Sequence, residues 1–164
     1  MPLPIRGVAH PPPPRQGGRN HKADLTSAEI DCTNLAGKPL LYEHDHSDRV
    51  GTVLASWKGR DGSLRIAANV EDADAIAQVR KGDLRGLSLG TGMTLDTDGN
   101  VAYRGQDELS ICTEGKRPGT WIDTIDGKIV RQVECFSKSE NGAHARCTAC
   151  GAPPTLCAKI HIHP

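Results

Sequence analysis

Aromatic residues are scarce in this chain, which has two Trp, two Tyr and one Phe among its 164 residues. Any hydrophobic core must therefore be built from aliphatic side chains, and hydrophobic residues in total reach only 37%. Glycine (18) and proline (11) are frequent, which indicates that turns and loops occupy much of the chain. A chain of this length typically forms one domain with a buried core. We therefore expect an ordered centre flanked by weakly ordered ends.

The chain also lacks net charge, because 20 Lys and Arg balance 20 Asp and Glu. Binding to nucleic acid needs a net basic face, so we expect no nucleic acid partner. No stretch approaches the roughly 18 apolar residues of a membrane span, and the first residues, MPLPIRGVAHPPPPRQGG, lack the apolar core of a secretory signal. We expect no membrane partner and a reducing compartment, where the six cysteines are free thiols or metal ligands rather than disulfides.

Composition divides the chain into three parts. Residues 1–23 are a Pro/Gly-rich N-terminal segment with room for one strand around residues 5–9. Residues 24–136 carry the periodic patterns of a folded domain. Residues 137–164 have no sustained period and are rich in Cys and His, so we expect a tail that is weakly ordered or binds metal.

Strand-like runs in the central part are separated by Asp-Gly dipeptides, at Asp61-Gly62, Asp98-Gly99 and Asp126-Gly127. Asp-Gly between apolar or β-branched runs is typical of tight hairpin turns. This punctuation predicts an antiparallel meander or a small barrel.

Two helices are expected beside the strands. Thr26 and Glu29 have the spacing of a capping box, which predicts a short helix near residues 27–35. Residues 71–83 predict a second helix, capped by acidic residues at its start and ended by Gly82. The predicted fold class is mainly β with flanking helices, an α+β fold.

Three short segments carry residues that could do chemistry. They are LYEHDH at residues 41–46, GLSLG at 86–90, and ELSICTEGKRPGT at 108–120. Taken singly, each is weak, since a His between acids is usually a surface residue and a Ser in an apolar run usually bonds locally. The serine is also not in a G-x-S-x-G elbow, which excludes the α/β-hydrolase reading.

In this order, the three segments resemble the motifs of the herpesvirus capsid maturation proteases, the assemblins, and more loosely those of phage prohead proteases. GKPLLYEHDHSDRVGTVLAS is similar to the first His motif, in which Pro-Leu leads into His-Asp and then Val-Gly and a strand. GLSLG resembles the Gly-Leu-Ser-Leu-Ser nucleophile segment, and ELSICTEGKRPGT resembles the third motif. The resemblance covers roughly residues 24–136 and implies a small antiparallel β-barrel that acts as a serine protease domain.

The resemblance implies that Ser88 is the nucleophile and His44 the general base, with His46 as the backup. Assemblins use a second His as the third triad member, and Glu108 stands at the matching position here. A carboxylate there can fix the tautomer of the imidazole and stabilise the imidazolium. Asp107 is adjacent, but neighbours on a strand face opposite sides, and we favour Glu108. We expect the Ser88 hydroxyl and the His44 ring within hydrogen-bond distance.

The same resemblance assigns the oxyanion hole to Lys116 and Arg117, through backbone amide and side chain. The family normally has Arg at the first of these positions, so Lys116 is a departure. Pro118 has no N–H to donate. Cys112 matches a family Cys near the active site, although a small buried residue is the simpler interpretation.

The tail offers a different chemistry. Cys147, Cys150, Cys157 and His161 could together bind zinc, although only one CxxC pair is present. A weakly ordered tail without metal is the alternative. The resemblance itself implies no cofactor.

The predicted function is a serine endopeptidase that cleaves scaffold protein and itself during virus capsid (prohead) maturation. Scaffold and capsid proteins would be its partners, and a homodimer is one possible assembly. It would act inside the immature capsid, in the host nucleus if herpes-like and in the bacterial cytoplasm if phage-derived. The alternatives are a non-catalytic metal-binding or capsid-interaction module, or a degenerate protease kept as scaffold.

Overall fold

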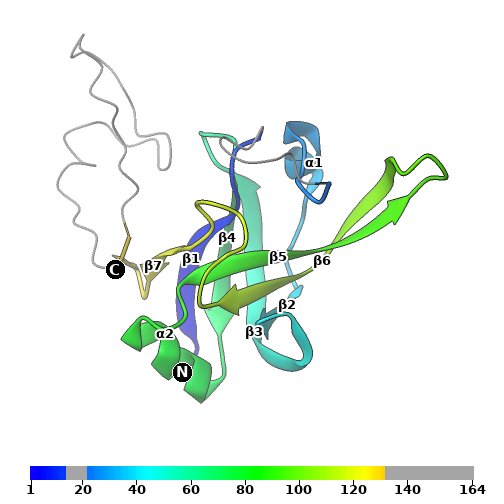
Figure 1. Ribbon diagram of the computed structural model, residues 1–164. Helices are drawn as coiled ribbons and strands as arrows, with labels where there is room; N and C mark the ends of the chain where they lie inside the picture. Colours follow the sequence, from blue (N-terminus) through cyan, green and yellow to red (C-terminus); the bar gives the residue numbers. More distant parts are fainter. Residues whose placement is uncertain (14–21, 132–164) are drawn as a thin grey trace, which may run out of the picture.

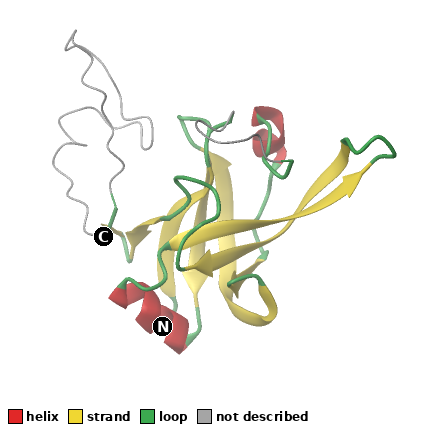
Figure 2. Cartoon of the chain, viewed as in Figure 1, coloured by secondary structure: helices red, strands yellow, loops and turns green. Residues whose placement is uncertain are grey.

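The computed structural model describes residues 1–13 and 22–131, which form eight strands and two helices (Figure 1). In chain order these are β1 (Leu3–His10), α1 (Ser27–Cys32), β2 (Pro39–Tyr42), β3 (Asp45–Lys58), β4 (Leu64–Val70), α2 (Ala73–Lys81), β5 (Gly86–Leu95), β6 (Val101–Cys112), β7 (Ile122–Ile125) and β8 (Lys128–Ile129). Strands dominate and the helices lie at opposite ends of the sheet (Figure 2). The prediction of a mainly β fold with flanking helices is confirmed.

All eight strands belong to one sheet, in the order β5-β6-β2-β3-β4-β1-β7-β8. β1 lies between β4 and β7, so the N-terminal segment supplies an internal strand. The edge strand β5 approaches the start of β7 at an isolated bridge between Gly86 and Trp121. Next to this bridge, the Ile122 N–H donates to the Arg85 carbonyl at 2.8 Å.

The sheet departs from the predicted small antiparallel barrel in two respects. The sheet does not close into a barrel, since its two edge strands, β5 and β8, are not paired with each other. β5 makes only the isolated bridge to Trp121. In addition, β2 and β6 run parallel, with Leu41 paired to Ser110. Turn signals fix the relative direction only of strands that a tight turn joins, and β6 reaches β2 by a long crossover.

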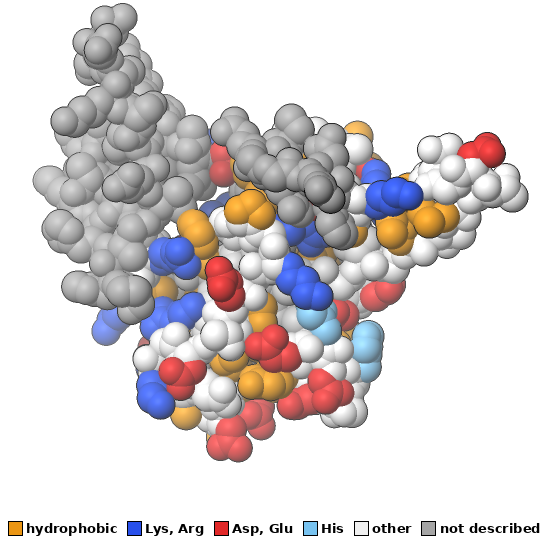
Figure 3. Space-filling model, in the orientation of Figure 1, with side chains coloured by type: hydrophobic (Ala, Val, Ile, Leu, Met, Phe, Trp, Pro, Cys, Tyr) orange, Lys and Arg blue, Asp and Glu red, His pale blue; other side chains and the backbone are white. Residues whose placement is uncertain are grey.

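The three predicted Asp-Gly turns are confirmed. They connect β3 to β4, β5 to β6, and β7 to β8. Each glycine has positive φ, at 91° for Gly62, 79° for Gly99 and 74° for Gly127. Glycine adopts this region without the steric cost that a Cβ adds. The hairpin of β5 and β6 projects from the sheet as a long arm, on which exposed Met93, Leu95 and Tyr103 lie (Figures 1 and 3).

Both helices begin as predicted. The Thr26 hydroxyl accepts from the Glu29 N–H at 3.2 Å and the Glu29 carboxylate accepts from the Thr26 N–H at 3.3 Å, which is the capping box. α1 nevertheless ends at Cys32 rather than near residue 35, because Thr33 is extended and its hydroxyl donates back to the Glu29 carbonyl. α2 ends at Gly82, which has φ 100°.

The core is aliphatic, as the composition requires. Its largest fully buried side chains all belong to Leu or Ile: Leu3, Ile5, Ile30, Leu35, Leu40, Leu41, Leu64, Ile66, Leu84, Leu87, Leu109 and Ile111. All but Leu41 belong to one hydrophobic cluster, to which strands β1 to β7, both helices and the connecting loops contribute. Neither helix in the described part of the chain is long and apolar enough to cross a membrane.

Candidate active site

His44 occupies the turn between β2 and β3. Glu43 and His44 both have positive φ, at 46° and 63°, a region that costs non-glycine residues energy. Contacts to β6, and to Thr113 just after it, hold the turn in place. The Glu43 N–H donates to the Ile111 carbonyl at 3.1 Å, the Glu43 carboxylate accepts from the Thr113 N–H at 3.0 Å, and the His44 N–H donates to the Ser110 hydroxyl at 2.9 Å. This anchoring fixes the direction of the imidazole.

The imidazole lies between a hydroxyl and a carboxylate. His44 Nε2 is 2.7 Å from Ser88 Oγ, and His44 Nδ1 is 2.5 Å from Glu108 Oε1. With Nδ1 protonated, the ring donates to the carboxylate and accepts from the serine hydroxyl. Ser88 is 6% exposed and Glu108 is 3% exposed, while the His44 side chain keeps 30%. The structure therefore brings together Ser88, His44 and Glu108, the three residues that the sequence resemblance predicted as a triad.

The alternatives to these residues lie elsewhere. Asp107 is exposed, and its carboxylate lies beside Gly92, whereas the carboxylate bonded to the His44 ring is that of Glu108. His46 is exposed on β3. Both ring nitrogens of His44 are hydrogen-bonded, to Glu108 and Ser88. This argues against the interpretation that His44 and His46 bind a metal ion together.

Two residues that the sequence analysis missed shape the position of Glu108. Ser110 donates to Glu108 Oε2 at 2.9 Å while it accepts the His44 N–H. Gly90 lies directly across the ladder from Glu108, and a Cβ there would be 2.0 Å from Oε1. The signal for Ser110 was present, because residues 108 and 110 must face the same side of a strand.

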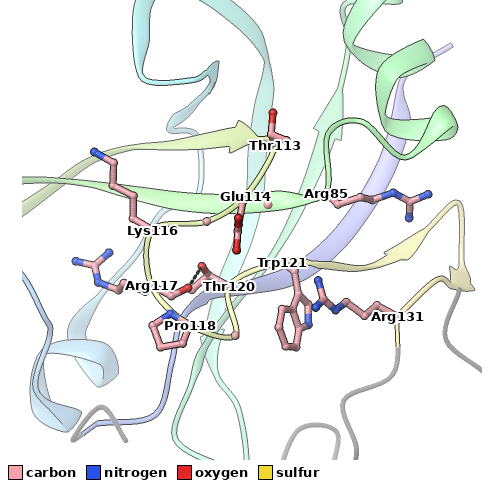
Figure 4. Close-up of a pocket in the computed structure, with 12 residues that line it drawn as sticks. Arg85, Thr113, Glu114, Lys116, Arg117, Pro118, Thr120, Trp121 and Arg131 are labelled. Atoms are coloured by element: carbon pink, nitrogen blue, oxygen red, sulfur yellow. Dashed lines mark hydrogen bonds between the residues drawn. The ribbon is translucent and has the colours of Figure 1, made fainter. Parts of the chain in front are cut away.

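Lys116 and Arg117 follow β6 in a loop that packs on β5. With His44 and Ser88 they line a cleft of about 380 Å³. The Arg117 guanidinium donates to Asp24 at 2.9 Å and to the Ala23 carbonyl at 2.8 Å, so it is bound to the segment before α1. Figure 4 shows the Lys116 and Arg117 side chains extending from the same end of the loop.

The loop itself is held close to the nucleophile strand. The Thr120 hydroxyl donates to the Arg117 carbonyl at 2.6 Å. Gly115 permits the close approach, since a Cβ there would lie 2.5 Å from the Leu87 carbonyl oxygen and 2.1 Å from the Thr120 hydroxyl. The backbone of the loop is therefore fixed next to Ser88 by close contacts.

Cys112 is a small buried residue, which agrees with the simpler of the two interpretations of its role. It is 2% exposed, and burial, with the nearby Glu43 carboxylate, raises the pKa of its thiol to about 12. A thiol with that pKa is not a nucleophile at neutral pH.

No group of three metal-binding side chains occurs within residues 1–13 and 22–131. The Cys147, Cys150, Cys157 and His161 group lies outside the described residues.

Comparison with known proteins gives a structural match and no sequence match. No family model matches the sequence, and no curated protein is similar to it. Among solved structures, the protease of Kaposi's sarcoma-associated herpesvirus (KSHV), in complex with a hexapeptide phosphonate inhibitor, superposes with a TM-score of 0.56 and 15% identity. The chain has the fold of a herpesvirus protease.

The match to the herpesvirus protease fold is partial. It covers 74% of this chain and 64% of that viral chain, slightly less than two-thirds of its length. A second KSHV protease structure, in complex with a dimer disruptor, gives a TM-score of 0.52 and 16% identity and covers 85% of each chain. At such identities the similarity establishes the fold and leaves the activity to the site residues.

Proposed function

We propose that this chain is a serine endopeptidase that cleaves scaffold protein, and itself, during maturation of a virus capsid. One observation carries the proposal. On a herpesvirus protease fold, a buried carboxylate, an imidazole and a serine hydroxyl form a continuous hydrogen-bonded line, from Glu108 through His44 to Ser88. That order of groups is what activation of a serine nucleophile requires.

The chemistry follows from this line of hydrogen bonds. His44 Nε2 accepts the proton of Ser88 Oγ as the oxygen attacks the peptide carbonyl, and the imidazolium then donates a proton to the leaving amine. Glu108 holds the ring in the required tautomer and stabilises its positive charge. Water activated by His44 hydrolyses the acyl-enzyme in the second half of the reaction.

The transition state also needs donors for the developing oxyanion, each worth about 2.7–4 kcal/mol in well-studied enzymes. Lys116 and Arg117 line the cleft beside Ser88 and are the residues we assign to this role. The Arg117 guanidinium is already bonded to Asp24 and Ala23, so the backbone of this pair is the better candidate than the arginine side chain.

Substrate, assembly and location belong to the same proposal. The substrate would be a scaffold or capsid protein inside the immature capsid. A homodimer is the assembly we propose to test, because one KSHV protease structure with this fold is a complex with a dimer disruptor.

The proposal is tested by comparing the wild type with Ser88→Ala for self-processing and scaffold cleavage, followed by intact mass. Ser63→Ala is the matched control, since Ser63 is also a buried, hydrogen-bonded serine but lies in the β3–β4 turn. We expect cleavage by the wild type and the control but none by Ser88→Ala. If neither folded wild type nor control cuts, even at concentrations that favour a dimer, the degenerate or non-catalytic alternative replaces this proposal.

A further inference from the structure

A second cleft, of about 340 Å³, borders the loop of residues 113–120. Its remaining walls are Arg85 and the start of β5, Trp121, and Arg131. Neither the serine nor the histidine of the proposed triad lines it. Figure 4 shows Arg85, Trp121 and Arg131 at the end of the loop away from Lys116, with the Arg131 side chain turned toward the indole. We call this cleft the arginine pocket.

Two residues that line the arginine pocket each carry a buried donor without an acceptor. Within the described part of the chain, Arg85 Nε and Trp121 Nε1 are the two buried side-chain nitrogen or oxygen atoms that lack a hydrogen-bond partner. Both groups can only donate. Buried polar groups are almost always satisfied, and an unsatisfied donor is costly. That both line the same cleft indicates an acceptor that binds there.

The charges in the pocket point the same way. Between residues 22 and 131, three other arginines pair with carboxylates: Arg65 with Asp123, Arg104 with Glu29, and Arg117 with Asp24. Arg85 and Arg131 form no such ion pair within the described residues. The Arg131 guanidinium instead lies 3.5 Å from the centroid of the Trp121 ring. Desolvation lowers the pKa of both guanidinium groups, but Arg131 is exposed and Arg85 is half-buried, so the desolvation cost that a bound anion would offset falls mainly on Arg85.

Glu114 is the one acidic side chain that lines the pocket, and it is exposed. Its charge acts on Arg131 from a distance, without an ion pair between them. It therefore reduces the positive potential of the pocket without supplying the missing acceptor. An anion entering the pocket would be repelled by the Glu114 carboxylate. Replacing Glu114 with glutamine should therefore raise the affinity of the pocket for anions.

We propose that the arginine pocket binds an oxyanion, a carboxylate or a phosphate, through the guanidinium groups of Arg85 and Arg131 and the indole N–H of Trp121. Guanidinium groups bind oxyanions through charge-assisted hydrogen bonds, often two at once. Because residues 113–120 form one wall, an anion bound here also ties that loop to β5. This consequence rests on the proposed function, since the loop carries the residues assigned to the oxyanion hole, whereas the binding itself does not.

The binding is measured by the fluorescence of Trp121. The chain has two tryptophans, so Trp57→Phe leaves Trp121 as the only indole. In the full chain with Trp57→Phe and Ser88→Ala, sodium phosphate and sodium acetate are titrated separately, with sodium chloride holding the ionic strength constant. We expect a saturable change with a dissociation constant on the order of a millimolar. Hydrogen exchange of the amides in residues 113–120 should slow at saturation.

Charge variants identify the site. Arg85→Gln and Arg131→Gln should each weaken binding at least about tenfold, since each removes a charge-assisted hydrogen bond. Glu114→Gln should tighten it about threefold by removing the repulsion. Arg80→Gln is the matched control, because Arg80 is exposed on α2 outside the pocket, and it should leave the affinity unchanged.

Saturation by phosphate alone assigns a phosphate-like ligand, and saturation by acetate alone or by both assigns a carboxylate or a general oxyanion site. The proposal is overturned if neither anion saturates, or if Arg80→Gln weakens binding as much as the pocket variants. If Arg85→Gln and Arg131→Gln do not fold, Glu114→Gln and Arg131→Lys provide the test. An unchanged affinity in Glu114→Gln would then contradict the proposal. Because the titration uses Ser88→Ala, a failure of the protease proposal does not affect it.

Discussion

Gly90 gives the sharpest test of the proposed triad, because the room it leaves is filled by Glu108. A Cβ at position 90 would lie 2.0 Å from Oε1, 2.4 Å from Cδ and 2.8 Å from Cγ of Glu108. These three atoms belong to one side chain and not to the backbone, so Gly90→Ala should displace the carboxylate while the strand remains paired. The displaced group would lose its hydrogen bonds to His44 and Ser110.

The expected loss of activity is large. Disabling the acid of a serine triad lowers kcat by about 10⁴, which corresponds to about 5 kcal/mol of transition-state stabilisation. We expect Gly90→Ala to lower kcat by about 10²- to 10⁴-fold, the range depending on how far the carboxylate moves. Its free energy of unfolding should fall by only about 1–3 kcal/mol, the cost of a buried polar group without its partner.

The assay is a double-mutant cycle on scaffold cleavage. In a Glu108→Ala background the clash is gone, so adding Gly90→Ala should lower kcat little further. Gly92→Ala is the matched control on the same strand, since its Cβ would meet only the end of the exposed Asp107 carboxylate, at 2.7 Å. Full activity in folded Gly90→Ala, or an equal loss in the Glu108→Ala background, would refute the reasoning.

Ser110→Ala should lower kcat about tenfold with KM unchanged, because Ser110 orients two members of the triad. Ser56→Ala is the control, since the Ser56 hydroxyl also bonds a backbone N–H, together with a carbonyl. Steady-state kinetics should show no change in this control. Cys112 should resist iodoacetamide in the folded protein at pH 8, since its pKa is about 12; mass spectrometry showing rapid labelling would contradict this. Glu29 has a pKa lowered to about 2, mainly by its hydrogen bond to Arg104, so its stabilisation is complete above its ordinary pKa of 4.5 and is lost as the pH falls toward 2. Thermal unfolding of Glu29→Gln from pH 6 to 2 should therefore show a weaker acid dependence than that of the wild type.

The features that the sequence predicted well depend on neighbouring residues. The capping box of Thr26 and Glu29, the end of α2 at Gly82 and the three Asp-Gly turns are each set within about four residues. The three candidate site residues were found differently, through motifs whose order resembles a known family.

The features that were missed depend on residues far apart in the chain. The parallel pairing of β2 with β6 joins Leu41 to Ser110, and no local pattern encodes it. The binding of Arg117 to Asp24 joins positions 93 residues apart. The match between Gly90 and Glu108 depends on a cross-strand register that becomes visible only once the strands are paired.

The parallel pair of β2 and β6 also bears on when activity could arise during synthesis. His44 follows β2, whereas Glu108 and Ser110 lie 64 and 66 residues further along, in β6. Contacts of such long sequence separation form late, because a large loop must be closed first. On a ribosome, β6 emerges only after most of the domain has been made. A nascent chain would therefore carry its histidine and serine without an aligned carboxylate, and the proposed proteolytic activity would be delayed until the sheet is complete.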